Sequence, residues 1–450
     1  MNSSESSPTL SAPPLATAPP RLDDFGWEVL KQRLRGDKVT RIALGFFDRY
    51  RDRHLKDLQV DEIDDQRRMR VGTQTLVNFG SDSFLGLDRD PRVHEAMREA
   101  TPRYGSHNGA SRAFWSISLT QEVERRLARW LGVPQTLLFG SVTLANVGLI
   151  PALAGKGDLL VVDRQSHDSI HQGVKIAQAN GANVQELFPC QGPVLRELLE
   201  REKARTRKAG FLMAVDGIYS MTGKVAPLVE LDQVTQEYGG TLYVDDAHGT
   251  GVVGDRGRGA AFQTLGSLRR ILMVGSLSKA FSCLGSFITC DDELQELLKI
   301  KSSTFIFGGP IPPPYLAAIW TVCEILDSVE GEQLLATLHA RIQQLVAGLR
   351  AQRLKVLGDQ GAIVSVVVGD IEKTFTAGKW LFDRGFYVQS ATYPAVPIQE
   401  GLLRIQVNAN HSSADIQALI AAIGEMQHEI PLPCSDHSRA VATAATEAVS

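Results

Sequence analysis

The stretch TLYVDDAHGTGVVG, residues 241–254, sets a short apolar run directly before two carboxylates, an imidazole and a glycine-rich turn. Four further apolar runs end in a similar way, each before a polar or glycine-rich break and a helical pattern. They are QTLLFG (135–140), DLLVVD (158–163), FLMAVD (211–216) and RILMVG (270–275). Continuous apolar strands that alternate with helices are typical of a mostly parallel sheet covered on both faces. We therefore predict an α/β fold over residues 96–315.

The residues that follow these five runs are those of a binding site. In chain order they are a helix start at 140–143, His167, Ser220, Asp245 with His248, and Lys279. Ligands of such sheets bind beyond the carboxyl ends of the strands. We therefore expect these groups to meet at one edge of the sheet and to form a cofactor site.

The remainder of the chain has a different pattern. Helical patterns at 334–349, 374–384 and 414–426 alternate with short strands at 362–368, 385–390 and 402–408, which predicts a compact α+β domain. A charged, amphipathic segment from Leu22 to about Val93 is expected to pack with this C-terminal part. The predicted divisions are a disordered leader (1–20), an arm and part of the small domain (21–95), a large domain (96–315), the rest of the small domain (316–432) and a disordered tail (433–450).

Composition narrows the class of protein. The net charge is −4 with both signs spread along the chain, so nucleic acid is not an expected partner. Five cysteines without a CxxC pair argue against a disulfide framework and a thiolate metal site, and favour a cytoplasmic protein. The leader lacks the features of a signal peptide. Residues 137–155 carry no charge, but their Gly, Ser, Thr, Asn and Pro content predicts a strand, turn and helix rather than a membrane span.

The chemistry that needs these groups together is that of pyridoxal 5'-phosphate (PLP). PLP requires a lysine for a Schiff base, an acid to keep its pyridine nitrogen protonated, and donors for its phosphate. Lys279 supplies the amine, Asp245 supplies the acid, and residues 140–143 supply a phosphate cradle at a helix N-terminus.

Two other cofactors fit less well. A metal ion could be bound by His248 with Asp245 or Asp246, and by His167, which is distant in sequence. The chain, however, has no HExxH motif or cysteine cluster. A dinucleotide would need a GxGxxG motif between a strand and a helix, and only isolated GxG triplets are present.

Asp245 and Asp246 are adjacent on an extended segment, so at most one of them faces the cofactor.

Several motifs together resemble the α-oxoamine synthases, which are fold type I PLP-dependent enzymes. They are SFLGL (83–87), DRQSHDS (163–169), DGIYSMTGKVAPL (216–228), YVDDAHGTGVVGDRGRG (243–259), GSLSKAF (275–281) and LLRIQVNANHS (402–412). The resemblance extends from about Val71 to His428. It implies a homodimer in which each active site borrows residues from the neighbouring chain.

The resemblance also implies roles for individual residues. Lys279 would carry PLP, Asp245 would pair with its pyridine nitrogen, and His167 would stack on its ring. His248 and Ser220 would bond the phenolic oxygen. The phosphate would be held by the amides of Ser141 and Val142 and by the hydroxyl of Ser276. Arg404 would bind the carboxylate of the amino acid substrate, with Asp82 nearby.

The implied reaction joins an amino acid to an acyl-CoA with loss of carbon dioxide, and gives an α-aminoketone and CoA. The sequence leaves open which amino acid and acyl chain are used, and whether a carrier protein replaces CoA. A PLP-dependent lyase, aldolase or aminotransferase on the same fold is an alternative. A non-catalytic partner subunit is another, although Lys279 argues against it.

Three segments depart from the family pattern. In YGSHNGASRAFWSIS (104–118), His107 and Ala110 replace glycines and Ser116–Ser118 replaces a Gly-Thr pair, near the expected substrate entrance. Gly308 and Gly309 stand where the family has threonines, one of which reaches the partner subunit's phosphate. Asp82 stands where an asparagine helps to hold the substrate carboxylate. It is expected to face a cation such as Arg404, to select a substrate with a hydrogen-bond donor, or merely to cap the following turn.

Overall fold

The computed structural model describes residues 25–50, 58–206 and 210–435. Residues 25–50 belong to a separate compact unit of two helices, α1 (Phe25–Gly36) and α2 (Lys38–Tyr50). The predicted leader lies outside the described residues, as does most of the predicted tail. The first residues of that tail are ordered, since the backbone of Cys434 forms an isolated antiparallel β-bridge with Leu354.

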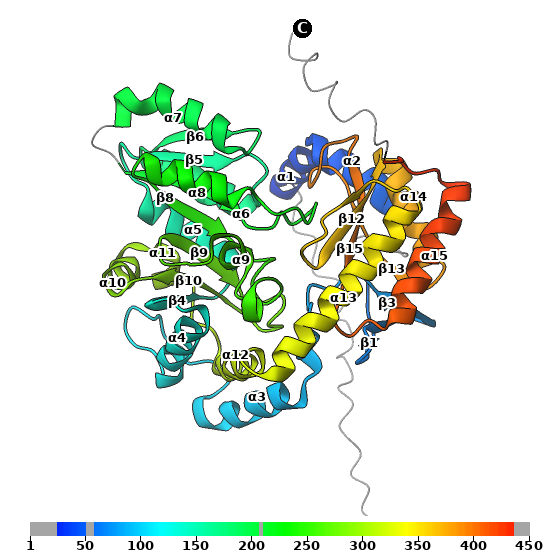
Figure 1. The fold of residues 1–450 in the computed structure, drawn as a ribbon, viewed down its shortest axis with the longest axis horizontal. Coiled ribbons are helices and arrows are strands. Elements are labelled where there is room, and N and C mark those ends of the chain that lie inside the picture. The colour runs from blue at the N-terminus through cyan, green and yellow to red at the C-terminus, as the bar shows by residue number, and fades with distance from the viewer. Residues whose placement is uncertain (1–24, 51–57, 207–209, 436–450) are drawn as a thin grey trace, which may run out of the picture. The chain divides into compact units, whose positions relative to one another are not determined.

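A seven-stranded sheet forms the centre of the second unit (Figure 1). Its strand order is β4 (Gln135–Phe139), β10 (Ser286–Cys290), β9 (Ile271–Ser276), β8 (Thr241–Asp245), β7 (Phe211–Asp216), β5 (Leu159–Asp163) and β6 (Asn183–Leu187). All strands are parallel except β10, which is antiparallel to both neighbours. The predicted α/β fold is confirmed, and the five predicted strands agree with the observed ones to within one residue at each end.

Two strands of this sheet were not predicted. In β6 three of the five residues of NVQEL are polar, because this strand lies at the edge of the sheet and is only partly buried. In β10 the sequence SFITC is short and follows Lys279 closely, so it was not separated from the segment around the lysine.

Helices cover both faces of the sheet. One face packs against α5 (Val142–Leu153), α6 (Asp168–Ala179), α10 (Asp292–Lys301) and α11 (Ser303–Phe307). The other packs against α3 (Pro91–Tyr104), α4 (Ser118–Leu131), α7 (Gly192–Thr206), α8 (Leu228–Glu237) and α12 (Pro313–Leu326). Successive strand residues alternate between the two cores: Leu137 and Phe139 belong to the first, and Leu138 to the second. This alternation explains why the strands are apolar throughout.

The C-terminal part contains an antiparallel sheet of β11 (Val356–Leu357), β12 (Ile363–Gly369), β15 (Gly401–Gln406) and β14 (Gln389–Ala391). Its helices are α13 (Val329–Ala351), α14 (Ile371–Phe382) and α15 (Ser413–Glu429). A third sheet, of β1 (Glu62–Ile63), β2 (Arg68–Val71), β3 (Gln74–Asn78) and β13 (Phe386–Tyr387), joins the two ends of this unit, since β3 pairs with β13. The domain boundaries remain a prediction.

The remaining short elements are η1 (Leu87–Arg89), η2 (Asp255–Gly257) and α9 (Ala260–Leu265). The strand predicted at 385–390 is two strands, β13 and β14, which belong to different sheets. Helix α13 begins earlier than predicted because the Ser328 hydroxyl caps it by accepting from the Gly331 N–H.

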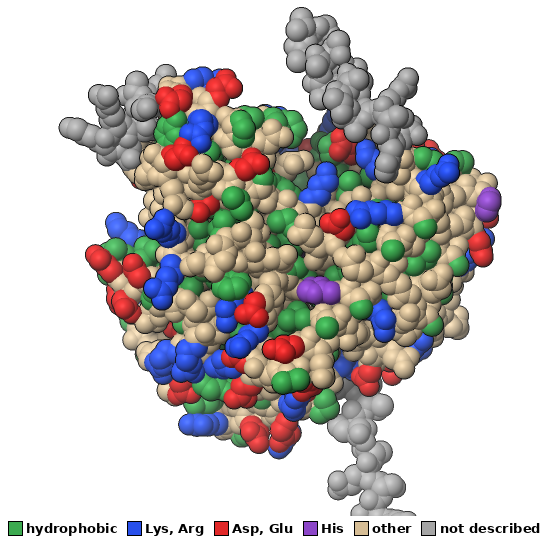
Figure 2. All heavy atoms as spheres, in the orientation of Figure 1, with side chains coloured by type: hydrophobic (Ala, Val, Ile, Leu, Met, Phe, Trp, Pro, Cys, Tyr) green, Lys and Arg blue, Asp and Glu red, His purple; other side chains and the backbone are tan. Residues whose placement is uncertain are grey.

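Residues 137–155 form most of β4, a turn and all of α5, as their composition predicts. Within the described ranges, no helix is both long and apolar enough to cross a membrane. Figure 2 shows acidic and basic side chains intermingled on the visible face.

Candidate active site

A cavity of about 150 Å³ lies beyond the carboxyl ends of the central strands. Its walls come from the segments that follow β4, β5, β7, β8 and β9. The lining residues are Ser141, Val142, Thr143, His167, Asp216, Ile218, Asp245, Ala247, His248, Ser278 and Lys279. Six of the ten predicted site residues are among them. Ser220, Ser276, Arg404 and Asp82 are not.

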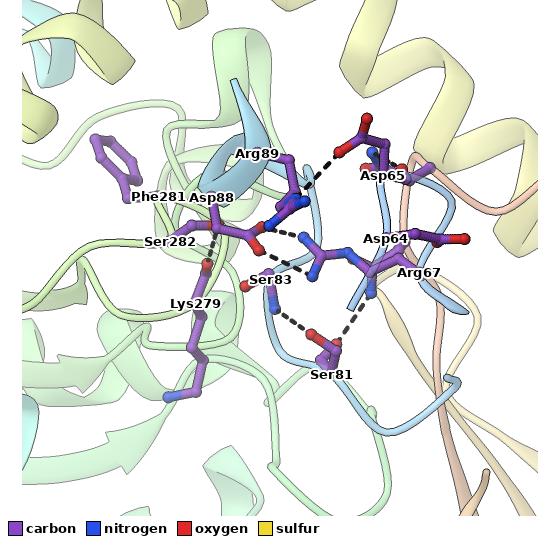
Figure 3. A network of polar contacts seen from close by, with 12 residues as sticks. Asp64, Asp65, Arg67, Ser81, Ser83, Asp88, Arg89, Lys279, Phe281 and Ser282 are labelled. Carbon is purple, nitrogen blue, oxygen red and sulfur yellow. Dashed lines mark hydrogen bonds and ion pairs between the residues drawn. The ribbon is translucent and has the colours of Figure 1, made fainter. Parts of the chain in front are cut away.

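Lys279 lies in a tight turn directly after β9. Its carbonyl oxygen accepts the Ser282 N–H at 2.8 Å, and Ser282 adopts a left-handed conformation with φ of 55° (Figure 3). A non-glycine residue in this conformation requires support from its surroundings and is common near functional sites. Burial lowers the pKa of the Lys279 amine, and the carboxylate of Asp245 opposes this effect. A lowered pKa makes the amine more available as a nucleophile and base.

Asp245 is fixed by two hydrogen bonds at the end of β8. Its Oδ2 accepts from Asn146 Nδ2 at 2.6 Å, and its Oδ1 accepts the Ala247 N–H at 3.1 Å. Asp246 instead accepts the Ala261 N–H through Oδ2 and does not line the cavity. Only one carboxylate of the pair therefore faces the site, as the alternation of an extended segment requires.

His167 caps helix α6 at the end of β5, and its side chain is exposed to the cavity. The backbone N–H of His167 donates to Asp216 Oδ1 at 3.1 Å. Asp216 and Asp245 are register partners on β7 and β8, so two buried carboxyl groups lie side by side. Burial, reinforced by the charge of Asp245, holds the pKa of Asp216 well above its ordinary range. These surroundings favour the neutral form of Asp216.

His248 presents an unsatisfied nitrogen to the site. Its side chain is buried, and Nδ1 has no hydrogen-bond partner among the described residues. Burial and the nearby charge of Lys279 hold the pKa of His248 well below its usual value. A neutral imidazole with an unpaired, buried nitrogen on a cavity wall is suited to bond a polar ligand atom.

The start of α5 provides a cradle for an anion. Ser141 caps the helix by accepting the Leu144 N–H at 3.2 Å. The N–H groups of Val142 and Thr143 belong to the first turn, where no preceding carbonyl is available to them. Both residues line the cavity, so their amides and the helix dipole favour a phosphate there.

A serine that was not predicted, Ser278, lines the cavity next to Lys279. Ser276 is completely buried, and its Oγ accepts the Ser278 N–H and lies 3.0 Å from Ser278 Oγ. Ser278 is exposed and lines the cavity. The structure therefore places the Ser278 hydroxyl at the wall and Ser276 behind it.

The two glycines that depart from the family pattern lie beside this cradle. A Cβ atom on Gly308 would come within 2.3 Å of the Thr304 carbonyl oxygen, and Gly309 adopts a φ of 78°. A Cβ atom on Gly140 would lie 3.7 Å from the Gly309 carbonyl oxygen. Threonine side chains at 308 and 309 would thus require a different path for this segment.

Arg404 on β15 forms a second polar cluster. The buried guanidinium donates from Nε to the Ser220 carbonyl oxygen at 2.6 Å and from Nη1 to Gln389 Oε1 at 2.7 Å. Nη2 lies 3.4 Å from Asp82 Oδ1, which also accepts from Gln406. Burial lowers the pKa of Arg404, and Asp82 opposes this shift. Of the three expectations for Asp82, the one observed is that it faces Arg404.

The groups around the cavity match the chemistry of PLP. Lys279 provides an amine with a lowered pKa, and Asp245 provides an oriented carboxylate. The orphaned nitrogen of His248 provides a partner for a ring substituent, and the start of α5 provides phosphate donors. The donor set therefore fits the cofactor.

Residues 74–423 match the family model for aminotransferases of class I and II. The chain belongs to this family. It is 34% identical to the 8-amino-7-oxononanoate synthase of Geobacter sulfurreducens over 87% of this chain and 99% of the relative. A serine palmitoyltransferase structure from Sphingomonas wittichii superposes with a TM-score of 0.79 and 26% identity, covering 92% of this chain and all of that one. A serine palmitoyltransferase from S. paucimobilis, solved with a PLP–myriocin aldimine, has a TM-score of 0.80 and 25% identity over 91% of this chain and 99% of that one.

These family members confirm the predicted resemblance to α-oxoamine synthases. Sequence reasoning nevertheless missed several polar residues of the site. Asn146, Ser169 and Tyr243 form a buried network behind Asp245, and Asp216 and Ser278 line the cavity. The one available signal was Asn146, a single amide in the otherwise apolar helical stretch VTLANVGLIPAL (142–153).

Proposed function

We propose that this chain is a PLP-dependent C-acyltransferase that condenses an amino acid with an acyl-CoA, releasing CoA and carbon dioxide. The predicted class, a PLP-dependent acyltransferase, is confirmed by the similar 8-amino-7-oxononanoate synthases and serine palmitoyltransferases. The observation that carries the proposal is the cavity in which Lys279, Asp245, His167 and His248 meet the start of α5.

Different residues of the site would bind different parts of PLP. Asp245 would hold a proton at the pyridine nitrogen, and His167 would cover the ring. His248 would bond the phenolic oxygen through its unpaired nitrogen, and Ser220 would bond the same oxygen. The amides of Val142 and Thr143 would bind the phosphate, together with Ser141 and the pair Ser276 and Ser278.

When bound, PLP supplies an electron sink for negative charge at the α-carbon of the amino acid. Lys279 would hold the cofactor before substrate binds and would then take the proton from the α-carbon, a role suited to an amine of lowered pKa. Asp245 would keep a proton at the ring nitrogen, and its negative charge would stabilise that protonated form. Acylation of the α-carbon by the thioester would release CoA, and decarboxylation would give an α-aminoketone.

Arg404 would bind the substrate carboxylate. Three of its N–H groups are already directed by Ser220, Gln389 and Asp82, which fixes the plane of the guanidinium. A fixed guanidinium orients a carboxylate more strictly than a lysine would. Asp82 would reduce the net positive charge available to the substrate.

The protein is proposed to act as a homodimer in the cytoplasm. Phe114 and Phe307 are 86% and 84% exposed, and the Ser111 hydroxyl donates to the Ile306 carbonyl oxygen, so the two aromatic residues belong to neighbouring segments. Exposed aromatic residues beside Gly308 and Gly309 are suited to a subunit interface near the cavity. Sedimentation of the active protein as a monomer would contradict a shared site.

Release of CoA tests the proposal. Purified protein would be titrated spectrally with amino acids, and each one that changes the absorbance of PLP would then be incubated with a panel of acyl-CoA thioesters. We expect stoichiometric CoA, detected with a thiol reagent, and an α-aminoketone detected by mass. Turnover of amino acids without CoA release would instead indicate a lyase, aldolase or aminotransferase.

A further inference from the structure

Asn146 occupies the centre of a buried polar network behind the cavity. The residue lies on α5, one turn beyond the residues that cap this helix, and its side chain is completely buried. Its Nδ2 lies 2.6 Å from Asp245 Oδ2 and 2.8 Å from Ser169 Oγ, and its Oδ1 lies 2.7 Å from the Tyr243 hydroxyl. Both protons of the amide and its oxygen are therefore in use.

The direction of each hydrogen bond in this network follows from its partners. The Asp245 carboxylate only accepts, so Nδ2 of Asn146 must face it, and Oδ1 accepts from Tyr243. Nδ2 also donates to Ser169 Oγ, which leaves the Ser169 proton free for His167 Nδ1 at 2.8 Å. The Ser169 N–H donates to the same His167 nitrogen at 3.2 Å.

The neutral His167 ring must then carry its proton on Nε2, because Nδ1 accepts hydrogen bonds. The Ser169 N–H fixes this tautomer, and the amide that orients Asp245 supports it by directing the Ser169 hydroxyl to the same nitrogen. An aliphatic residue at 146 would leave Asp245 Oδ2 with one hydrogen bond fewer. It would also free the Ser169 hydroxyl to rotate.

We propose that Asn146 is a positioning residue that sets the orientation of Asp245 and, through the Ser169 hydroxyl, helps to hold the His167 ring in place. The inference rests on the proposed PLP site, in which these two residues contact the pyridine nitrogen and the ring face. Asn146 itself does not line the cavity, so it acts through Asp245 and Ser169. Helix α5 would then serve both ends of the cofactor, with its first turn at the phosphate and Asn146 behind the ring nitrogen.

The test uses the full-length holoenzyme without substrate. We expect Asn146→Ala to release PLP about tenfold faster than the wild type on dilution, since it removes a hydrogen bond to a charged group. The pH midpoint of the bound cofactor's absorbance should also move by about half a pH unit or more. Ser169→Ala removes the hydroxyl that joins Asn146 to His167 but keeps the bond from Asn146 to Asp245, so it should change PLP release less than Asn146→Ala does.

Asn408→Ala is the matched control, because Asn408 is equally buried and its Nδ2 donates to the Ser81 carbonyl oxygen outside this network. It should lower thermal stability comparably and leave the absorbance titration unchanged. Asn146→Ala with wild-type PLP release and midpoint would overturn the inference, as would an equal shift in Asn408→Ala. A wild-type protein that binds no PLP would overturn the proposed function as well, whereas the other results concern Asn146 alone.

Discussion

Asp82 Oδ1 lies 3.4 Å from Arg404 Nη2, so a carboxylate faces the guanidinium that is proposed to bind the substrate carboxylate. The side chain of Asp82 is 39% exposed, whereas that of Arg404 is almost completely buried. The anion of the pair therefore reaches solvent, whereas its cation is buried. A substrate carboxylate bound by Arg404, as proposed, would share the guanidinium with Asp82.

Replacement of Asp82 tests this arrangement. Two like charges about 4 Å apart repel by about 1 kcal/mol in water-like surroundings, which corresponds to roughly fivefold in affinity. Asp82→Asn should therefore bind glycine, alanine and serine about fivefold more tightly, while a native substrate that donates to the carboxylate should bind more weakly. Spectral titration of both proteins with an amino acid panel measures this. Identical affinities and ranking would leave Asp82 without a role in selectivity.

Ser276 and Ser278 should contribute differently to phosphate binding. Ser278 lines the cavity, and Ser276 is buried behind it and accepts its N–H. Ser278→Ala should speed PLP release several-fold with little change in thermal stability, whereas Ser276→Ala should lower both PLP retention and stability. Release rates and melting temperatures of the two holoenzymes decide the matter. If the Ser278→Ala protein retains PLP like the wild type, Ser278 does not bind the phosphate, and Ser276 is the better candidate.

The Asp245→Asn protein should retain PLP but lose most of its catalytic activity, because a neutral amide does not stabilise a protonated ring nitrogen. Exchange of the substrate α-proton with solvent should slow by about 100-fold or more. The exchange can be followed by NMR in deuterated buffer. Near-normal exchange in this variant would contradict the proposed role of Asp245.

Asp246 should make stability depend on pH. Burial raises its pKa to about 7, from an ordinary value of 3.8. Between these values the native protein binds a proton that the unfolded chain has lost, so the stabilisation present at low pH is lost as the pH rises to about 7. Asp246→Asn lacks this titration, and its amide oxygen can still accept the Ala261 N–H.

Melting temperatures of wild type and Asp246→Asn between pH 5 and 8 measure this dependence. The wild type should lose stability relative to the variant as the pH rises, by at most about 1.4 kcal/mol per pH unit, with no further change above about pH 7.5. Parallel pH profiles would show that Asp246 does not titrate in this range.

The sequence predicted those parts of the fold in which residues face apolar cores on both sides. The strands that precede Ser141, Asp245 and Lys279 are of this kind, which is why the site residues at their ends could be named in advance. Strand β6 was missed because this edge strand is mostly polar and only partly buried. Strands β13 and β14 were merged because pairing partners cannot be read from a run of residues.

The site was predicted less completely than the fold. Groups expected to contact PLP directly were found from motifs, but Asn146 and Tyr243 lie behind them and are joined only by tertiary packing. The orientation of a side chain at a strand end was also not predictable, which is why Ser278 rather than Ser276 lies at the cavity wall. Polar residues inside helices and strands acquire their partners only when the layers pack together.

Covalent attachment of PLP to Lys279 is the most direct test of the account. The purified protein should be yellow, and borohydride reduction followed by peptide mapping should place the cofactor on the peptide that contains Lys279. Lys279→Ala should show neither the yellow absorbance of the covalent link nor the labelled peptide. Cofactor found on a different lysine, or a Lys279→Ala protein labelled like the wild type, would contradict the assignment of this site.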